Sequence, residues 1–147
     1  MHHTPSPATQ SLLERVREGA GHPDLEGVEL VVRPALAATA IDVLEADGYV
    51  LGTPANFGYM SGALKHFFDL VYYPCLDATA GRPYGLYVHG NDDTTGAVRA
   101  VEAITGGLGW RRAQPVLEVA ATPDAAALDA AWELGAAVAA TLATAAG

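Results

Sequence analysis

One stretch of the sequence, residues 52–62, combines the residue types of a ring-binding loop: Gly-Thr-Pro-Ala-Asn-Phe-Gly-Tyr-Met-Ser-Gly. It follows a short apolar run, residues 49–51, and precedes a helical pattern that begins near Ala63. A strand that ends in a Gly- and Pro-containing loop before a helix is how open α/β sheets build ligand sites. Backbone N–H and C=O groups and an aromatic side chain can hold a flat polar ring there. The leading hypothesis is therefore a bound flavin.

A second segment, Thr4-Pro5-Ser6-Pro7-Ala8-Thr9, places three hydroxyl groups directly before the first expected helix. Side-chain hydroxyls and the positive end of a helix dipole together suit a phosphate dianion. The alternative needs no ligand, because Ser6 or Thr9 can cap the helix while the prolines fix the turn. Taken alone, the segment favours capping. Together with residues 52–62, it favours phosphate binding.

Hydrophobic periodicity predicts alternating helices and strands behind these two loops. Helices are expected at residues 8–19, 39–46, 61–72, 94–108 and 123–145, with Thr122 capping the last. Strands are expected at residues 28–33, 48–52, 84–89 and 115–120. Strands separated by helices indicate βαβ units and a parallel sheet.

The first strand of this pattern is missing. Only Met1, His2 and His3 precede the loop of the first helix, where a doubly wound sheet places its central strand. We expect these residues to be the last part of that strand, with the start of the sequence clipped or misassigned.

Composition excludes several classes of protein. The 147 residues, half of them hydrophobic, suit a single domain over residues 1–147. The net charge of −9 disfavours binding to nucleic acid or an anionic membrane. We recognise no apolar run of membrane-spanning length and no signal peptide, so we expect a cytoplasmic protein without a membrane span. We also recognise no third ligand near His2 and His3, so we expect no metal.

The two loops together resemble those of the flavodoxin-like FMN proteins, in particular the NAD(P)H-dependent FMN reductase and NAD(P)H:quinone oxidoreductase branch. The phosphate loop of that family is approximately Ser/Thr-x-Ser/Thr-Gly-x-Thr, which residues 4–9 match except at Pro7. The next signature is similar to Gly-Thr-Pro-x-x-Phe-Gly-x-Met-Ser-Gly, followed by a helix of the type x-Leu-Lys-x-Phe-x-Asp. Residues 52–69 match that signature throughout.

The resemblance implies a flavodoxin-like doubly wound α/β fold with strand order 2-1-3-4-5 and helices on both faces of the sheet. It implies three sets of FMN contacts. The phosphate would be held by Thr4, Ser6, Pro7, Ala8 and Thr9. One side of the ring would lie along Pro54, Ala55, Asn56, Phe57 and Gly58. The other side would be closed by His89, Gly90 and Asn91.

The activity implied is transfer of hydride from NAD(P)H through FMN to a quinone or a similar small acceptor, without an obligatory side-chain acid or base. His89 is the one possible catalytic residue, since it could protonate a quinone; a buried structural histidine is an equal alternative. A non-enzymatic electron carrier of the flavodoxin type is the second hypothesis, and a flavin-free binding protein is the third.

Two departures from the family pattern bear on these hypotheses. Pro7 has no N–H, so one phosphate donor is lost where the family has Gly, and FMN would bind more weakly. Asn91 is followed by Asp92 and Asp93 instead of Gly-Gly, and these acids suit the first turn of a helix. Relatives of this family commonly pair so that one subunit covers the flavin of the other, so a homodimer or higher homo-oligomer is expected. The aromatic residues Phe57, Tyr59, Tyr72 and Tyr73 could supply the contact.

Overall fold

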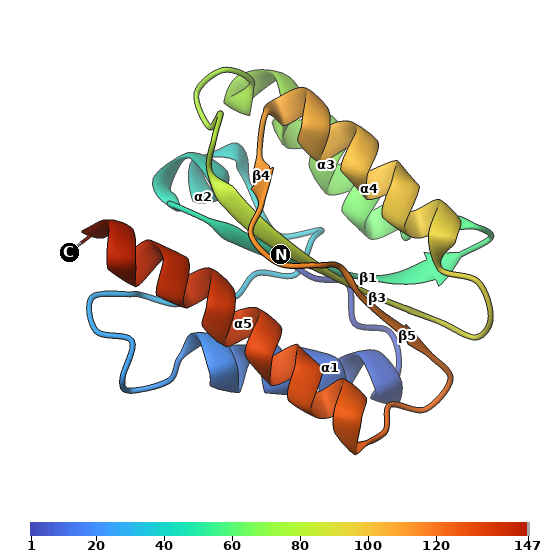
Figure 1. Cartoon of the computed structure of the whole chain (residues 1–147). Helices are drawn as coiled ribbons and strands as arrows, with labels where there is room; N and C mark the ends of the chain where they lie inside the picture. The colour runs from blue at the N-terminus through green and yellow to red at the C-terminus, as the bar shows by residue number, and fades with distance from the viewer. Residues whose placement is uncertain (147) are drawn as a thin grey trace.

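The computed structural model describes residues 1–146. A five-stranded sheet lies between two layers of helices (Figure 1). One face is covered by α1 (Pro7–Ala20) and α5 (Ala125–Ala146). The other is covered by α3 (Gly62–Cys75) and α4 (Thr95–Leu108), with the short α2 (Ala40–Glu45) beside α3. This arrangement confirms the prediction of an α/β sheet with helices on both faces.

The central strand of the continuous sheet is β3 (Pro83–Gly90), which is buried along its whole length. It pairs in parallel with β1 (Tyr49–Asn56) on one side and with β4 (Arg111–Arg112) and β5 (Leu117–Ala120) on the other. The two-residue β2 (Tyr59–Met60) is antiparallel to β1. Burial on both faces explains why β3 has no alternation of polar and apolar residues.

Beyond β1, the sheet continues only as single bridges made by His2. This residue bridges Gly52 of β1 on one side and Pro34 on the other, parallel to both. Across the sheet, Pro34, His2, β1, β3 and β5 follow one another, which are the places of the predicted 2-1-3-4-5 order. The first two places are marked by single bridges and not by strands. Residues 1–3 occupy the place of the first strand, as expected.

The predicted strand at residues 28–33 is wrong. This segment forms no strand, and within the described chain its backbone makes one backbone hydrogen bond, in which Arg33 accepts from the N–H of His2 at 3.1 Å. The neighbour that would pair with the segment is the first strand, and residues 1–3 reach only its last position. A strand without a ladder partner does not form.

The strand predicted at residues 48–52 ends too early, because β1 continues to Asn56. The ladder with β3 extends as far as the pair Pro54 and His89. Phe57 and Gly58 then turn the chain into β2 with positive φ angles of 50° and 73°. Two consecutive residues with φ above zero are typical of a tight two-residue hairpin turn. Residues 54–58 are therefore a strand end and a hairpin tip instead of an irregular loop.

The helices agree with the predicted ranges, and most of them are capped by a side chain within a few residues of the helix start. Ser61 accepts a hydrogen bond from the N–H of Leu64 at 3.2 Å and caps α3, as the sequence suggested. The prediction that Thr122 caps the last helix is wrong. Asp124 takes this role, because α5 begins at Ala125 and the Asp124 carboxylate accepts from the N–H of Ala127 at 2.8 Å.

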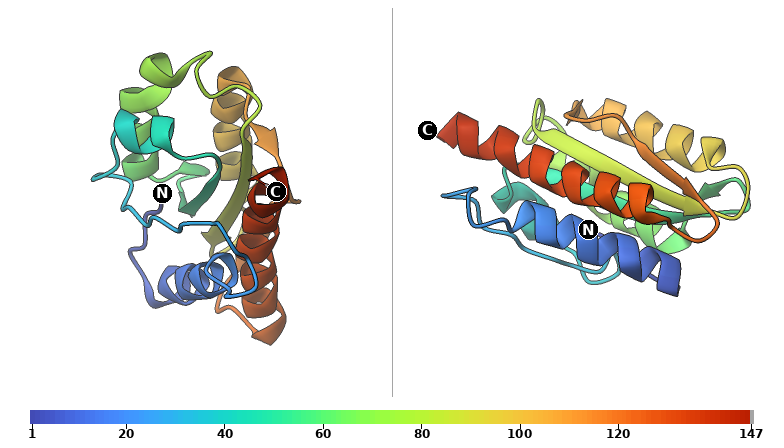
Figure 2. Two further views of the ribbon diagram at one scale, coloured as in Figure 1. Left: turned by 90° about the vertical axis from the view of Figure 1, so that its left-hand side faces the viewer. Right: turned by 60° about the horizontal axis from the view of Figure 1, so that its bottom comes forward.

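Helices α1 and α5 lie side by side along one face of the sheet (Figure 2). Glycines allow their backbones to approach closely: a Cβ atom on Gly19 would lie 2.0 Å from the carbonyl oxygen of Trp132, and one on Gly135 would lie 2.1 Å from that of Val16. Leu12 and Val16 of α1 are buried with Tyr87 in the hydrophobic cluster beneath the two helices.

The described part of α5 includes a 19-residue stretch, Ala125–Ala143, that is long and apolar enough to cross a membrane. The expectation that no apolar run reaches that length is therefore wrong. The many alanines give the stretch a high mean hydropathy, although it carries Asp129 and Glu133. In this structure α5 packs against α1 and β3, and the glycine contact with α1 accounts for its small side chains on that face.

Candidate functional site

The three loops singled out in the sequence leave the sheet at one edge. His2 is bridged to Gly52, and Pro54 is paired with His89, so residues 1–3, β1 and β3 end side by side. Parallel strands place their carboxyl ends at the same edge of a sheet. The structure thus brings together residues 4–9, 54–58 and 89–91, and we call this region the carboxyl edge.

At the carboxyl edge, the start of α1 is closed by its own side chains. Ser6 is the N-cap, and its hydroxyl accepts from the N–H of Thr9 at 3.2 Å. The Thr9 hydroxyl accepts from the N–H of Ser6 at 3.1 Å, and Thr9 is fully buried. This reciprocal capping box satisfies two helix-end donors without a ligand. The structure therefore shows the alternative in which Ser6 and Thr9 cap the helix.

One donor remains available in the first turn of α1. Pro7 has no N–H, and among the described residues the N–H of Ala8 donates to no protein atom. Thr4, just before the turn, has its hydroxyl 2.7 Å from Nδ1 of His2. Burial and the neighbouring Met1 amine lower the pKa of His2 to about 4, so its ring is neutral at neutral pH. An anion here would meet hydroxyl groups, one N–H group and the helix dipole, but no formal cation.

The β1–β2 hairpin presents the most strained residue of the edge. Phe57 adopts φ of 50°, which is rare for a large side chain, and its ring is fully exposed at the tip. The hairpin is held in place by α4, because a Cβ on Gly96 would lie 1.9 Å from the carbonyl oxygen of Gly58. Strain that the surroundings enforce, at an exposed aromatic residue, is a feature of ligand-contacting loops.

One buried hydroxyl, that of Thr53, fixes the base of the same hairpin. Thr53 is fully buried; its hydroxyl donates to the carbonyl oxygen of Pro54 at 2.8 Å and accepts from the N–H of Ser61 at 3.0 Å. The bond to Ser61 links the end of β1 to the start of α3. Sequence reasoning missed the role of Thr53, although this threonine lies inside the quoted 52–62 motif.

His89 lies at the end of β3, with 9% of its surface exposed. Its Nε2 atom is 2.6 Å from the carbonyl oxygen of Ala121, and a carbonyl only accepts, so this nitrogen carries the proton. Ala121 has φ of 57° and its N–H donates to the carbonyl oxygen of Gly90. His89 thus holds the β5–α5 loop against the edge, which favours a structural role for His89 over a catalytic one. No signal in the sequence pointed to Ala121.

The loop after Gly90 is exposed at Asn91 and then enters α4. Asp93 accepts a hydrogen bond from the N–H of Thr95 at 2.9 Å, and hydrogen bonds from Thr95 hold the pKa of this carboxyl below its usual range. Thr94 donates to the carboxylate of Glu118 on β5 at 2.7 Å. The expectation that Asp92 and Asp93 lie in the first turn of the helix is wrong, because both precede the N-cap Thr94 and the first turn of α4 has no acidic residue. Asp93 instead accepts from the first turn from outside it.

The carboxyl edge is an open surface in the described part of the chain. Asn56, Phe57, Gly58 and Asn91 are exposed, and the two principal cavities are lined by other residues. A planar ring resting here would be held between loops that already have their own hydrogen bonds. Such an arrangement can bind a ligand mainly through backbone groups and aromatic surface.

Comparison with known proteins assigns the sequence pattern to a family. The family described as NADPH-dependent FMN reductase matches residues 12–127, which is most of the chain. A flavodoxin from Aquifex aeolicus (strain VF5) is 44% identical over 61 residues, which are 42% of this chain and 32% of that protein. The chain thus matches about a third of the length of this curated relative.

Solved structures show the same fold. A flavodoxin from the domain Archaea superposes with a TM-score of 0.81 and 16% identity, covering 97% of this chain and 95% of that one. A flavodoxin described as WrbA-like, from Agrobacterium tumefaciens, gives a TM-score of 0.75 and 18% identity, covering 97% and 94%. At this identity the likeness establishes the flavodoxin-like fold alone.

Proposed function

This chain belongs to the NADPH-dependent FMN reductase family, and on that premise we propose that it passes hydride from NAD(P)H through FMN to a quinone or a similar small acceptor. The coarser activity, that of an FMN-dependent oxidoreductase, follows from the family. The observation that carries the proposal is the convergence of three loops, from three adjacent parallel strands, at the amino end of α1.

The residues present fit a ring with a phosphate tail. The phosphate would lie at the start of α1, near the free N–H of Ala8 and the hydroxyls of Thr4 and Ser6. Thr9 would act through Ser6, because its own hydroxyl is buried in the capping box. The absence of Lys and Arg from residues 4–9 agrees with anion binding by a helix end and hydroxyls.

The ring would lie between the β1–β2 hairpin and the loop after β3. Pro54, Ala55 and Asn56 would contact it through the strand end, with Phe57 and Gly58 at the tip. Gly90 and Asn91 would close the other side, positioned by the bond between His89 and Ala121. FMN, when bound, supplies the hydride chemistry, and the chain would hold and orient the ring.

The test is reconstitution followed by turnover. The full chain is incubated with FMN and desalted; then the visible spectrum is recorded, and oxidation of NADH and of NADPH is measured with benzoquinone as acceptor. Retained flavin with quinone-dependent oxidation of either nucleotide is the expected result. Chain that retains no flavin at micromolar FMN would overturn the proposal.

A non-enzymatic electron carrier is the second candidate, and the net charge of −9 favours it because an acidic surface docks basic redox partners. In that case the flavin would be retained, but nucleotide oxidation would need an added reductase. The third candidate, a flavin-free binding protein, rests on Pro7 and on the incomplete first strand, and a preparation that takes up no FMN would support it.

We also propose that the active form is a homodimer or a higher homo-oligomer in the cytoplasm. Phe57 and Tyr59 expose aromatic side chains on the hairpin at the carboxyl edge. Tyr73 is also exposed, but it lies in the last turn of α3, beside the half-buried Tyr72 and away from this edge. Exposed aromatic surface of this kind is typical of an interface. Light scattering on the chain and on a Phe57→Ser variant tests this, with a smaller mass expected for the variant.

A further inference from the structure

The choice between NADH and NADPH as hydride donor depends on where the chain offers a free cation. NADPH differs from NADH by one phosphate group, on the ribose of its adenosine half. A phosphate monoester of this kind adds about −1.5 to −2 charges at neutral pH. A chain with a net charge of −9 repels such a group unless a cation lies close to it. The position of each Lys and Arg side chain therefore bears on the donor.

Most of the eight Lys and Arg side chains already have a partner. Five of them are bonded to or paired with an oxygen of the chain: Arg15, Arg33, Lys65, Arg82 and Arg112. The other three make no side-chain hydrogen bond or ion pair with the described residues: Arg17, Arg99 and Arg111. An unpaired guanidinium group can bind an anion without first giving up a partner.

One of these three unpaired groups borders the carboxyl edge. Arg17 is in the last turn of α1, a helix that begins at this edge and runs away from it. Arg111 belongs to β4, which pairs with Pro83 and Tyr84 at the opposite end of β3. Arg99 lies in α4, on the turn that follows the one at the edge. In the described chain, Arg99 is thus the unpaired cation beside the proposed flavin site.

Helix α4 connects Arg99 to the hairpin at the edge. The start of α4 rests on the β1–β2 hairpin (Figure 1). The two backbones touch there, since a Cβ on Gly96 would lie 1.9 Å from the carbonyl oxygen of Gly58. Arg99 is three positions after Gly96, which is about 4.5 Å further along the helix axis. A dinucleotide that leaves the ring across the hairpin tip therefore passes along α4 toward Arg99.

The carboxylate that would ordinarily pair with Arg99 is engaged elsewhere. Glu102 lies three positions after Arg99, a spacing at which side chains of one helix meet. Its carboxylate instead accepts a hydrogen bond from Arg112 at 2.7 Å. Arg99 is exposed to solvent. Its planar guanidinium group is therefore free to donate more than one N–H to a phosphate.

On the premise of the oxidoreductase function proposed above, we propose that Arg99 binds the ribose phosphate of NADPH and makes NADPH the preferred donor. The nicotinamide would lie at the flavin ring, and the phosphate, in the other half of the dinucleotide, would lie at the second turn of α4. Asp92 and Asp93, both exposed just before α4, would repel a phosphate nearer the ring. Arg99 sets specificity and takes no part in hydride transfer.

Lys65 is the alternative cation near the edge. Its charge interacts with Tyr59 of the hairpin, so it lies on the α3 side of the same feature. Its ammonium group is bonded to the carboxylate of Asp69, one turn further along α3. A phosphate at Lys65 would have to displace this carboxylate or lie beside it. The unpaired guanidinium of Arg99 carries no such cost.

The experiment removes one cation at a time from the full chain loaded with FMN. Arg99→Gln is the test, and Lys65→Gln examines the alternative. Arg111→Gln is the matched control, because Arg111 is also exposed and unpaired in the described chain but lies at the opposite end of the sheet. Calorimetry gives the affinities for NADP⁺ and NAD⁺. The value of kcat/KM is measured for NADPH and NADH with benzoquinone as acceptor.

We expect the unsubstituted chain to bind NADP⁺ more tightly than NAD⁺. Arg99→Gln should weaken NADP⁺ binding at least about tenfold, because hydrogen bonds to a charged group are lost. The value of kcat/KM for NADPH should fall by a similar factor. Binding of NAD⁺ and retention of FMN should not change. Arg111→Gln should leave both nucleotide affinities unchanged.

Equal affinity of the unsubstituted chain for the two nucleotides would overturn the inference. An equal loss of NADP⁺ binding in Arg99→Gln and Arg111→Gln would also overturn it, and a loss confined to Lys65→Gln would assign the phosphate to Lys65 instead. In each case, flavin-dependent oxidation of NADH would leave the proposed oxidoreductase function standing. A chain that neither binds nor oxidises either nucleotide would overturn both.

Discussion

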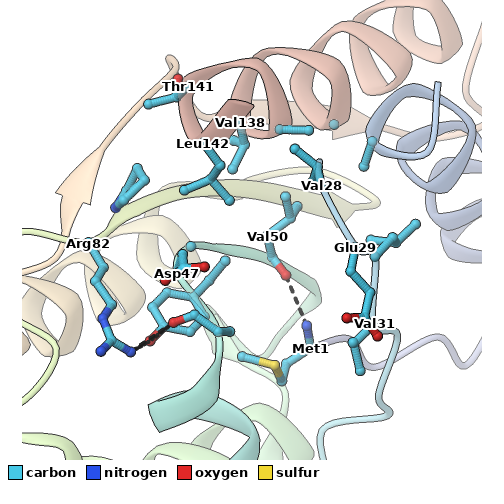
Figure 3. Close-up of a pocket in the computed structure, with 18 of the residues that line it drawn as sticks. Met1, Val28, Glu29, Val31, Asp47, Val50, Arg82, Val138, Thr141 and Leu142 are labelled. Atoms are coloured by element: carbon cyan, nitrogen blue, oxygen red, sulfur yellow. Dashed lines mark hydrogen bonds between the residues drawn. The ribbon is translucent and has the colours of Figure 1, made fainter. Parts of the chain in front are cut away.

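The carboxyl edge lies on one side of residues 1–3, and on the other lies a groove lined by Met1, residues 27–33, the start of β1 and the facing sides of α1 and α5 (Figure 3). The two regions differ in how many of their polar groups have hydrogen-bond partners. At the edge, Ser6 and Thr9 bond each other, Thr53 bonds Ser61, and His89 bonds Ala121. In the groove, the backbone of residues 28–32 has no backbone partner in the described chain, and the Met1 amine is buried.

The comparison shows that the two regions depend on different kinds of interaction. The edge is built largely from bonds within short segments, such as the Ser6–Thr9 box, so it forms once each loop is made. The groove depends on pairing between residues 1–3 and segments about 30 and 50 positions away in sequence. Four perturbations test this difference.

The largest effect is expected where α1 and α5 touch, since both regions rest on α1. Gly135→Ala places a Cβ about 2.1 Å from the carbonyl oxygen of Val16, so the helices must separate. We expect a loss of about 3 kcal/mol in the free energy of unfolding, measured by urea denaturation. Gly106→Ala is the matched control, because nothing lies within 4 Å of its added Cβ.

Gly106→Ala should leave stability unchanged or raise it slightly, since alanine favours helix formation. If the Gly135→Ala variant is as stable as this control, the close contact between the helices does not contribute to the free energy of unfolding.

The second perturbation is pH, and its main target is the Met1 amine in the groove. The Met1 amine has a pKa near 6 when folded and 8.0 as its ordinary value. Between these values the unfolded chain binds more protons, so stability rises as pH increases from 6 to 8 and the penalty is complete below 6. A shift of this size corresponds to about 2–3 kcal/mol at most.

The lowered pKa of His2, near 4 against 6.5, extends the same trend to lower pH, reduced by its partial exposure. Asp42 opposes the shift at Met1 through its negative charge. Urea midpoints at pH 6 and 8 measure the effect. An Nα-acetylated chain should lose the rise between pH 6 and 8. If acetylation leaves the profile unchanged, the amine is not the titrating group.

The third perturbation removes a helix cap at the edge. Ser6→Ala should cost about 1 kcal/mol of stability, because the N–H of Thr9 loses its acceptor. Thr39→Ala removes the equivalent capping box of α2, far from the proposed phosphate position, and is the matched control. Only Ser6→Ala should also weaken FMN binding in a fluorescence titration. Equal FMN affinity in the two variants would show that Ser6 does not bind the phosphate of FMN.

The smallest effect on stability is expected at the hairpin tip. Phe57→Gly relieves a positive φ that costs a non-glycine residue about 1 kcal/mol, so the unfolding midpoint should stay level or rise. At the same time, loss of the aromatic ring should lower FMN affinity and turnover. A variant that gains stability and keeps full FMN affinity would show that Phe57 does not contact the ring.

Much of the edge could be predicted because its signals are local. The capping of α3 by Ser61 and the hydroxyls of residues 4–9 at the start of α1 could each be predicted from adjacent residues. The same approach was wrong at residues 28–33, whose apolar composition is typical of a strand, because a strand also needs a neighbour. It also missed the bonds of His89 and Thr53, whose partners are 32 and 8 positions away.

The amino-acid sequence by itself determined the order of the five helices, the places of β1, β3 and β5, the two signature loops and the membership of this chain in a flavin-binding family. These depend on periodicity, capping and turn residues, which act over a few positions. Only the tertiary structure decided that β1 ends in a hairpin with Phe57 at its tip, that His89 holds Ala121, and that a groove lies behind residues 1–3. Those features depend on which backbone groups find partners far along the chain, and pairing over such distances leaves no pattern in neighbouring residues.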